Sequence, residues 1–517
     1  MKKIVILGGG TAGWVTALYI QRYWPDVSIT VIEDPNRPPI IAGESGNTLF
    51  TDFLNRININ KDDFIKATNA TPKLGGRFVD WNGVGTEFLH VMQTDHSPWL
   101  DNWNEFLDNA PTLNITLNRI FSEKIRSIYL KTVLANDVPL HHMFHSGELL
   151  RQNKVPIGSY SPLPCNPMWH FDSRAAALWF KDIGLQRNLE VVLGEYVDAE
   201  RGVDGDVTQV ILKDGRRIEG DWFFDCSGFS RLLINKLLKV EQIDLSENFP
   251  ARSVVAWWSE SNPSLTTNAF AMPHGWSWNI NLRHRSGNGY IFDPDCITLD
   301  QAIDEASVRF NKKVEPVANF TYTPGISKLH WKNNVIAVGL SSGFLEPLEA
   351  NGVAVIIEAM YSLLDYWDPD QSVKAHHIKT EKFNNRMFTL YNDIKDFLAL
   401  HYRGKRNDSE YWKKLKNEKT IPDSLKEKLQ QWEDFYYRDG AEPQCLGYSE
   451  AAWLMVLQGL DYFDVKILQQ RPFVKIHETS GLEIINKSRE YYKQLVDPFC
   501  TLDEWMLKTG YNANKEN

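Results

Sequence analysis

The alternation of apolar and polar residues divides the first part of the chain into a strand, a turn, a helix and a second strand. A β-branched apolar run, Ile4–Leu7, enters the glycine-rich stretch Gly8–Trp14, and apolar residues at helical spacing follow as far as Ile20. A second apolar run covers Val27–Ile32 and ends at Glu33. Short apolar runs beside glycine turns are typical of buried strands, and recurrence every three or four positions indicates a helix. The pattern therefore predicts a β-α-β unit.

The pattern is less regular in the next part of the chain. Residues 48–68 have a helical pattern, residues 77–81 have the pattern of a strand, and the section from about 90 to 165 has weak periodicity that indicates loops over helices. A clear pattern returns at Asp172-Ser173, which can cap a helix from Arg174 to about Ile183.

Short strands in the pattern of a β-meander follow this helix. They are predicted at 189–193, 209–212 and 217–219, and they lead into an apolar strand that ends in Asp225-Cys226-Ser227-Gly228. A strand that ends in Asp-x-x-Gly after a meander recurs in FAD-binding folds, where it returns to the first sheet. Later elements are predicted as a strand at 334–339, an apolar helix at 352–367, a charged helical section that includes 423–438, and a last helical block at 449–460 and 482–492 before an uncapped polar tail.

Composition narrows the class of protein. The chain has 517 residues, of which 43% are hydrophobic and 24% are charged, as in ordinary soluble proteins that are large enough for more than one domain. The formal net charge of −10, without a long basic block, argues against nucleic acid as a partner. Eighteen tryptophans can line aromatic pockets, although core and surface positions are expected for most of them.

The cysteines and the apolar runs bear on the compartment. The five cysteines are scattered, odd in number and without a C-x-x-C pair, so we expect neither a metal site nor a disulfide framework; they are Cys165, Cys226, Cys296, Cys445 and Cys500. No apolar run approaches the roughly 18–20 residues of a membrane span, and the first strand begins within three residues of the N-terminus, which leaves no room for a cleavable signal. We therefore expect a cytoplasmic protein that does not enter a membrane.

The glycine turn has the spacing of a dinucleotide site. Gly8 permits the tight turn, Gly10 lets backbone amides approach a pyrophosphate, and Gly13 lets helix and strand pack closely. Glu33 follows at the distance at which an acid binds ribose hydroxyls. No second G-x-G-x-x-G is present, so a separate nicotinamide domain is not expected. The predicted cofactor-binding residues are Gly8, Gly10, Thr11, Ala12, Gly13, Glu33, Gly43, Glu44, Ser45, Asp225, Gly339 and Leu340.

Several stretches together resemble the flavin-dependent halogenases of the tryptophan-halogenase type. Gly8–Trp14 is similar to the family's extended glycine motif, and Gly275–Ile280 resembles its W-x-W-x-I-P signature. Gly339–Glu349 is similar to the run that ends in F-L-E-P-L-E, and Lys73–Trp81 to the segment with the catalytic lysine. Trp169–Asp172 and His401-Tyr402 also match. The resemblance covers residues 1 to about 412 and weakens beyond.

The resemblance implies an α/β fold, with a Rossmann-type, monooxygenase-like FAD module, an inserted β-sheet and a helical C-terminal substrate part. We expect the FAD and halide module to span residues 1–366 and the substrate-side region to span 367–517. The implied cofactor is reduced FAD from a separate flavin reductase, which with oxygen and a halide ion yields hypohalous acid. This oxidant would cross an internal tunnel to a small aromatic substrate. A homo-oligomer is possible, and no metal is implied.

The resemblance also assigns roles to individual residues. Lys73 would hold or covalently trap the oxidant, and Glu349 would orient it and accept the ring proton. Halide would lie on the backbone amides of Asn351 and Gly352. Trp276 and Trp278 would separate the flavin from the substrate, and His90 and Tyr448 would lie near the substrate. Without the resemblance, Lys73 is expected to be an ordinary solvated lysine and Glu349 an acid in the first turn of a helix. The two tryptophans are then residues on the same face of a strand, and His90 is a histidine of the core.

Three departures from the family pattern bear on the substrate. Asn281 replaces the proline of the tryptophan signature, Ala350 replaces a serine, and Cys445–Gln458 does not reproduce the set that holds free tryptophan. We therefore expect an indole- or phenol-like aromatic in a wider pocket, with the choice among chloride, bromide and iodide open. Two alternatives to a halogenase are a flavin-dependent aromatic hydroxylase and a non-enzymatic flavin-binding regulator.

Overall fold

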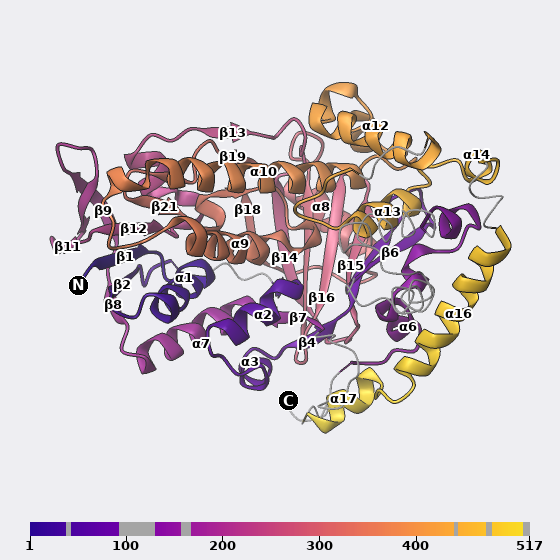
Figure 1. Ribbon diagram of the computed structural model, residues 1–517, viewed down its shortest axis with the longest axis horizontal. Coiled ribbons are helices and arrows are strands. Elements are labelled where there is room, and N and C mark those ends of the chain that lie inside the picture. Colours follow the sequence, from indigo (N-terminus) through magenta and orange to yellow (C-terminus); the bar gives the residue numbers. More distant parts are fainter. Residues whose placement is uncertain (38–42, 93–129, 157–166, 439–442, 472–477, 510–517) are drawn as a thin grey trace, which may run out of the picture. The chain divides into compact units, whose positions relative to one another are not determined.

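A computed structural model describes residues 1–37, 43–92, 130–156, 167–438, 443–471 and 478–509 (Figure 1). Backbone contacts divide the chain into two compact units. The first unit comprises Met1–Thr71, Trp169–Asn262 and His274–Lys395, and the second comprises Pro72–Met168, Pro263–Pro273 and Asp396–Asn517. The functional division expected at residue 366 stays a prediction. Cys165 and much of the section from 90 to 165 lie outside the described residues.

The first unit contains a six-stranded sheet that is parallel except at one edge. Its strands are β1 (Lys3–Leu7), β2 (Ser28–Glu33), β8 (Glu190–Leu193), β12 (Trp222–Asp225), β20 (Trp331–Lys332) and β21 (Val335–Ala337), in the order β20-β21-β12-β1-β2-β8. Only β20 pairs antiparallel, with β21. Residues 4–7 of β1 are buried, which explains why this run is continuously apolar rather than alternating. The predicted α/β fold is confirmed.

Helices pack on this sheet and place the glycine turn (Figure 1). The helices α1 (Thr11–Tyr23), α7 (Ser173–Gln186) and α9 (Asn351–Tyr366) all belong to the first unit, and α1 contacts both others. The predicted cap of α7 is present, since the amide of Ala175 donates to Asp172 over 3.0 Å. The helix predicted at 48–68 is instead two helices, α2 (Thr48–Arg56) and α3 (Lys61–Ala67), separated where Asn58 has a φ of 55°.

The meander differs from its prediction by one strand. It consists of β9 (Tyr196–Arg201), β10 (Val207–Leu212) and β11 (Arg217–Glu219), while the first predicted strand, β8, belongs to the main sheet. Within β9 only Ala199 is buried, so its sequence has no apolar alternation that would reveal a strand. Residues of β10 pack with Val5 and Phe223 in one apolar core.

Antiparallel strands form the inserted part of the first unit. The strands β14 (Ser253–Ser259), β16 (Gly275–Asn281), β17 (Ser286–Phe292) and β18 (Pro316–Thr321) lie in the order β18-β14-β17-β16, with α8 (Leu299–Arg309) against β14 and β17. A smaller sheet contains β13 (Gln242–Asp244), β19 (Gly325–Ser327) and β22 (Gly343–Phe344). The strand β3 (Gly43–Ser45) pairs antiparallel with β7 (Met168–Asp172).

The second unit combines three strands with helices. The strands are β5 (Gly75–Val79), β6 (Glu87–Val91) and β15 (Thr266–Met272), and β5 pairs with both others. The helical elements are η1 (Leu140–Met143), α6 (His145–Arg151), α11 (Glu410–Lys414), α12 (Asp423–Arg438), α13 (Glu450–Gly459), α14 (Val465–Gln469), α16 (Glu478–Val496) and α17 (Leu502–Lys508). Three elements cross the boundary in sequence: β4 (Thr71–Lys73), β7 and α10 (His377–His401).

The prediction of an uncapped polar tail is wrong as far as residue 508. Thr501 and Glu504 form a capping box at the start of α17, and Leu502, Trp505 and Met506 are buried. The cap supplies the first-turn amides with partners, and the buried face stabilises a helix too short to persist alone. Within the described residues, no helix has both the length and the apolar character needed to cross a membrane.

Candidate active site

The N-terminus of α1 forms an open cradle of backbone amides. Gly8 follows β1 with a φ of 126°, and a methyl group there would overlap the carbonyl of Cys226. A methyl group at Gly13 would overlap the carbonyl of Gly8, so strand and helix are in close contact. Gly10 caps α1 without a side-chain hydrogen bond, and nothing lies within 4 Å of a methyl group built on it. Unpaired amides at an open helix N-terminus fit a phosphate.

Glu33 lies beside this cradle at the end of β2. Its carboxylate forms an ion pair with Lys181 of α7 over 2.9 Å, and a methyl group on Gly9 would overlap the Glu33 side chain. The acid is therefore held next to the glycine turn, as binding of a ribose requires. Lys181, which the sequence pattern did not single out, orients the acid.

The loop that includes β3 adds polar groups without partners. Oγ of Ser45 and Oδ1 of Asn47 are buried, and neither has a hydrogen-bond partner among the described residues. Buried polar atoms are nearly always satisfied, so these two fit a polar ligand such as FAD. Gly43 belongs to β3, while the side chain of Glu44 lies outside what is described.

Asp225 has a different environment from the one expected for a group that binds cofactor directly. The carboxylate is fully buried and accepts hydrogen bonds from the amides of Leu233 and Ile234, each over 2.8 Å, and from the amide and hydroxyl of Ser227. These bonds fasten the turn after β12 to the π-helix Leu232–Leu237. Its role at the cofactor stays a prediction.

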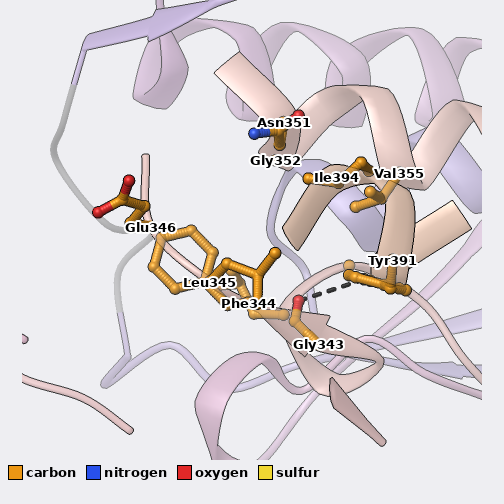
Figure 2. Close-up of a pocket in the computed structure, with 11 residues that line it drawn as sticks. Gly343, Phe344, Leu345, Glu346, Asn351, Gly352, Val355, Tyr391 and Ile394 are labelled. Carbon is orange, nitrogen blue, oxygen red and sulfur yellow. Dashed lines mark hydrogen bonds between the residues drawn. The ribbon is translucent and has the colours of Figure 1, made fainter. Parts of the chain in front are cut away.

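A pocket of about 300 Å³ joins the predicted cofactor and halide residues (Figure 2). Gly339 and Leu340 line it together with Asn351 and Gly352, and the other lining residues are Gly343, Phe344, Leu345, Glu346, Val355, Tyr391 and Ile394. A methyl group on Gly339 would approach Cβ of Ala12 to 2.9 Å, so the pocket wall contacts the start of α1. In Figure 2, Asn351 and Gly352 lie across the pocket from Phe344 and Gly343.

The halide side of the pocket has a strained backbone. Glu349 and Ala350 have φ values of 61° and 57°, and two consecutive left-handed residues other than glycine are unusual. They lead directly into α9, whose cap residue Ala350 makes no side-chain hydrogen bond. Nδ2 of Asn351 donates back to the carbonyl of Leu348 over 2.7 Å. The turn thus presents first-turn amides of a long helix at the pocket, where an anion is favoured.

Two buried tryptophans and a glutamate form one group in the first unit. Trp276 and Trp278 lie on β16 with ring centroids 5.9 Å apart, and both are buried. The indole nitrogen of Trp276 donates to Oε2 of Glu346 over 3.3 Å. Sequence reasoning quoted Glu346 within the F-L-E-P-L-E run but gave it no role. The two apolar residues that precede it, Phe344 and Leu345, are the feature of the sequence that could have indicated a buried carboxylate.

The second unit contains Lys73 and an aromatic cluster. Lys73 ends β4 and is only 5% exposed, which rejects the reading as a solvated lysine. His90 of β6 lies 5.7 Å from the ring of Phe397 and 6.3 Å from that of Tyr448. Phe397 and Tyr448 stack at 3.8 Å. Lys73 and Glu349 belong to different units, so their joint action stays a prediction.

A search of the described residues finds no group of three or more His, Cys, Asp or Glu side chains that could hold a metal ion. A Rossmann-type sheet and an amide cradle with an acid beside it define the class of dinucleotide-binding proteins.

Comparison with known proteins gives the family. The tryptophan halogenase family model matches residues 3–470, and the chain belongs to this family. It is 30% identical over 452 residues to a 7-chloro-L-tryptophan 6-halogenase of Kutzneria sp. (strain 744), a match that covers 83% of this chain and 84% of the relative. It is also 30% identical to a tryptophan 6-halogenase of Streptomyces toxytricini, over 83% of both chains.

Solved structures of flavin-dependent halogenases have the same fold. The Streptomyces toxytricini enzyme superimposes with a TM-score of 0.82 at 26% identity and covers 98% of this chain and 100% of its own. A flavin-dependent halogenase from Brevundimonas sp. BAL3 gives a TM-score of 0.77 at 26% identity, with 98% and 99% covered. The chain is thus a flavin-dependent halogenase, an oxidoreductase that uses FADH2 from a separate reductase, oxygen and halide. Family membership does not favour the hydroxylase alternative.

Proposed function

We propose that this halogenase modifies an indole- or phenol-like aromatic and that Lys73 and Glu349 carry the transfer step. The observation that carries the proposal is the burial of Lys73, whose side chain is only 5% exposed. Burying an amine costs free energy, so a role at a reaction site explains this lysine better than a structural role at the surface would. Reduced FAD, when bound, would give two electrons to oxygen and halide would give two more, so that hypohalous acid and water form.

The cofactor is held by the residues around the glycine turn. The amides at Gly10, Thr11 and Ala12 would bind the pyrophosphate, and Glu33 would bind the ribose. The hydroxyl of Ser45 and Oδ1 of Asn47 would form hydrogen bonds with polar groups of the cofactor. Halide would bind at the amides of Asn351 and Gly352, in the pocket that Gly339 and Leu340 also line.

Lys73 and Glu349 act on the oxidant and on the substrate. The Lys73 amine holds the oxidant, as a hydrogen-bonded hypohalous acid or as a haloamine. Glu349 orients it and accepts the proton that the aromatic ring loses when the carbon–halogen bond forms. Trp276 and Trp278 exclude water from the flavin side, which protects the oxidant from side reactions.

The substrate would bind in the region 367–517 together with β6. Tyr448 and His90 are half-buried, and the buried ring of Phe397 supports both, so Tyr448 and His90 offer the partly exposed rings that fit an electron-rich aromatic ring. The related enzymes that are named above act on tryptophan or chlorotryptophan. Because Cys445–Gln458 departs from the tryptophan-holding pattern, we propose a ring without the free amino-acid group.

The test is a mass-spectrometric assay of the purified chain with FAD, a flavin reductase and NADH. A panel of indoles and phenols, with free tryptophan included, is offered with chloride, bromide and iodide in parallel. We expect a halogenated product from the wild type and none from Lys73→Ala, with hydrogen peroxide release unchanged.

Lys131 provides the matched control, because it is also a buried lysine of the second unit, 3% exposed and placed over the ring of Phe435. Lys131→Ala should keep halogenation per folded molecule. Product from Lys73→Ala would contradict the proposed mechanism, and a preference for free tryptophan would contradict the proposed substrate class.

A further inference from the structure

Arg231 is a buried cation of the first unit without an anionic partner. Its side chain is 5% exposed, Nη1 is completely buried, and its guanidinium forms no ion pair or hydrogen bond with any described residue. Asp225 is the neighbouring carboxylate, but its oxygens are taken by backbone amides and by Ser227. An unpaired buried charge costs several kcal/mol, so this arginine does not stabilise the fold by pairing.

A chain of buried hydrogen bonds connects the surroundings of Arg231 with the pocket. Nδ1 of His330 lies 2.8 Å from Oγ of Ser342, which donates to the hydroxyl of Tyr391 over 3.2 Å. The Tyr391 hydroxyl donates in turn to the carbonyl of Gly343 over 3.2 Å, the bond drawn in Figure 2. Because both hydroxyls donate onward, Nδ1 of His330 carries the hydrogen, and its buried Nε2 is an acceptor without a partner among the described residues.

The other groups of this network add no positive charge. Burial, together with the charge of Arg231, lowers the pKa of His330 to about 3, so His330 is neutral at physiological pH. Its ring stacks on Tyr391 with centroids 5.3 Å apart and an interplanar angle of 1°. Arg231 is therefore the positive charge that acts on Tyr391, a residue that lines the pocket. The segment before it contacts the pocket wall, because the rings of Phe229 and pocket-lining Phe344 lie 5.5 Å apart.

The pocket needs such a charge if it binds an anion. Glu346 lines the same pocket and is 1% exposed, so its carboxylate opposes the entry of halide. The helix amides at Asn351 and Gly352 supply only partial charges. In a region of low dielectric the charge of Arg231 offsets this carboxylate as well as that of its neighbour Asp225, so its loss would leave both unopposed.

We propose that Arg231 is the positioning residue whose buried positive charge allows halide to bind in this pocket beside Glu346. The inference rests on the proposed halide site and adds the charge that governs its affinity. Arg231 is not among the residues that line the pocket, so it acts through its electrostatic field and touches neither halide nor substrate.

The test measures chloride and bromide binding separately from turnover. The ³⁵Cl NMR line broadening of the chain with oxidised FAD reports chloride binding, and steady-state assays give KM for halide and for the aromatic substrate. We expect Arg231→Gln to weaken chloride binding and raise KM for halide roughly tenfold, with KM for the aromatic substrate unchanged. Arg231→Lys should restore most of the binding.

Two further variants keep the test decisive if Arg231→Gln does not fold. His330→Glu places a carboxylate at a position that interacts electrostatically with Arg231, and it should weaken chloride binding to a similar extent, whereas His330→Gln should not. Arg187→Gln removes a charge of the same unit whose guanidinium donates to the carbonyls of Ile57 and Asn58, and it should leave halide binding unchanged.

The outcomes separate the two proposals. Chloride binding that is equal in wild type and Arg231→Gln, or equal in His330→Glu and His330→Gln, would overturn the role of Arg231 while leaving the halide site in place. An absence of saturable chloride binding in the wild type would contradict the proposed halide site itself, and the role of Arg231 with it.

Discussion

The indole N–H of Trp276 donates to the carboxylate of Glu346 over 3.3 Å, and both side chains are buried in the first unit. This bond connects β16 to the loop that leads through Glu349 to the predicted halide site at the start of α9. The tryptophan signature and the F-L-E-P-L-E run, which lie 70 positions apart at these two residues, are therefore parts of one structural group. Each motif restrains the backbone on which the other depends.

Removal of the donor should destabilise the first unit. We expect Trp276→Phe to lower the free energy of unfolding by about 2 kcal/mol, because it deletes a hydrogen bond to a buried carboxylate while keeping an aromatic ring. Urea unfolding measures the change. Trp331→Phe is the control, since that buried indole donates to the neutral carbonyl of Asn333 and should cost less. Equal losses in the two variants would show that the carboxylate adds nothing.

Two glycines of the turn should separate folding from cofactor binding. Gly13→Ala would force a methyl group into the carbonyl of Gly8, so we expect a loss of several kcal/mol in stability. Gly10→Ala meets nothing within 4 Å, so it should fold with a nearly unchanged Tm but bind FAD at least tenfold more weakly, because the methyl group occupies the cofactor's space. Thermal unfolding and flavin fluorescence titration check both. Wild-type FAD affinity in Gly10→Ala would place the pyrophosphate elsewhere.

The sequence predicted those parts of the fold in which local pattern and burial agree. The turn at Gly8–Gly13 and the capped helix after Asp172 were predicted because glycine spacing and a cap are local signals. The strand β9 was missed because Ala199 is its single buried residue. The helix α17 was missed because it is only 7 residues long, although the Thr501–Glu504 box was visible in the sequence.

The site was predicted only in part, because charge and burial depend on tertiary contacts. Cofactor and halide residues Gly339, Leu340, Asn351 and Gly352 do line one pocket. No sequence pattern revealed that Arg231 is buried without a partner or that Lys181 holds Glu33, since burial and an ion pair between distant segments both depend on the tertiary fold. The surroundings of Asp225 likewise follow from the tertiary course of residues 227–234.

Glycine in place of Ala350 should relieve strain in the turn before α9. Ala350 has a φ of 57°, which costs an alanine about 1 kcal/mol and a glycine almost nothing. We therefore expect Ala350→Gly to raise the free energy of unfolding by up to about 1 kcal/mol. Ala359→Gly, in the buried interior of the same helix, should lower it by about 1 kcal/mol. A loss of stability in Ala350→Gly would mean that the methyl group makes a contact worth more than the strain.

Acid should destabilise the second unit through its buried histidines. Burial lowers the pKa of His141 and of His145 to about 4, and it also lowers that of His142. The unfolded chain takes up protons near pH 6.5, which the folded chain does not do until about pH 4. The free energy of unfolding should thus be constant above about pH 6.5 and fall between pH 6.5 and 4, by about 2 kcal/mol at pH 5 for each of His141 and His145.

Urea unfolding at pH 7.5 and pH 5 tests this dependence. His145→Gln should lose less stability on acidification than the wild type, because it removes one of the titrating groups. The control is His377→Gln at an exposed position, which should leave the pH dependence of the free energy of unfolding unchanged. If His145→Gln loses as much free energy of unfolding as the wild type between pH 7.5 and pH 5, this histidine is protonated alike in the folded and unfolded chains.

The stacked rings of the second unit should govern binding of the aromatic substrate and not of halide. Tyr448 stacks on Phe397 at 3.8 Å beside His90, and Tyr436 stacks on Phe463 at the same distance elsewhere in the unit. We expect Tyr448→Leu to raise KM for the aromatic substrate about fivefold or more, since a lost aromatic contact costs about 1 kcal/mol, while KM for halide stays constant. Tyr436→Leu, the matched loss of one stacked tyrosine, should reduce stability and leave both KM values unchanged. If Tyr448→Leu and Tyr436→Leu change KM alike, the rings at Tyr448 are ordinary core, and the substrate binds at another surface.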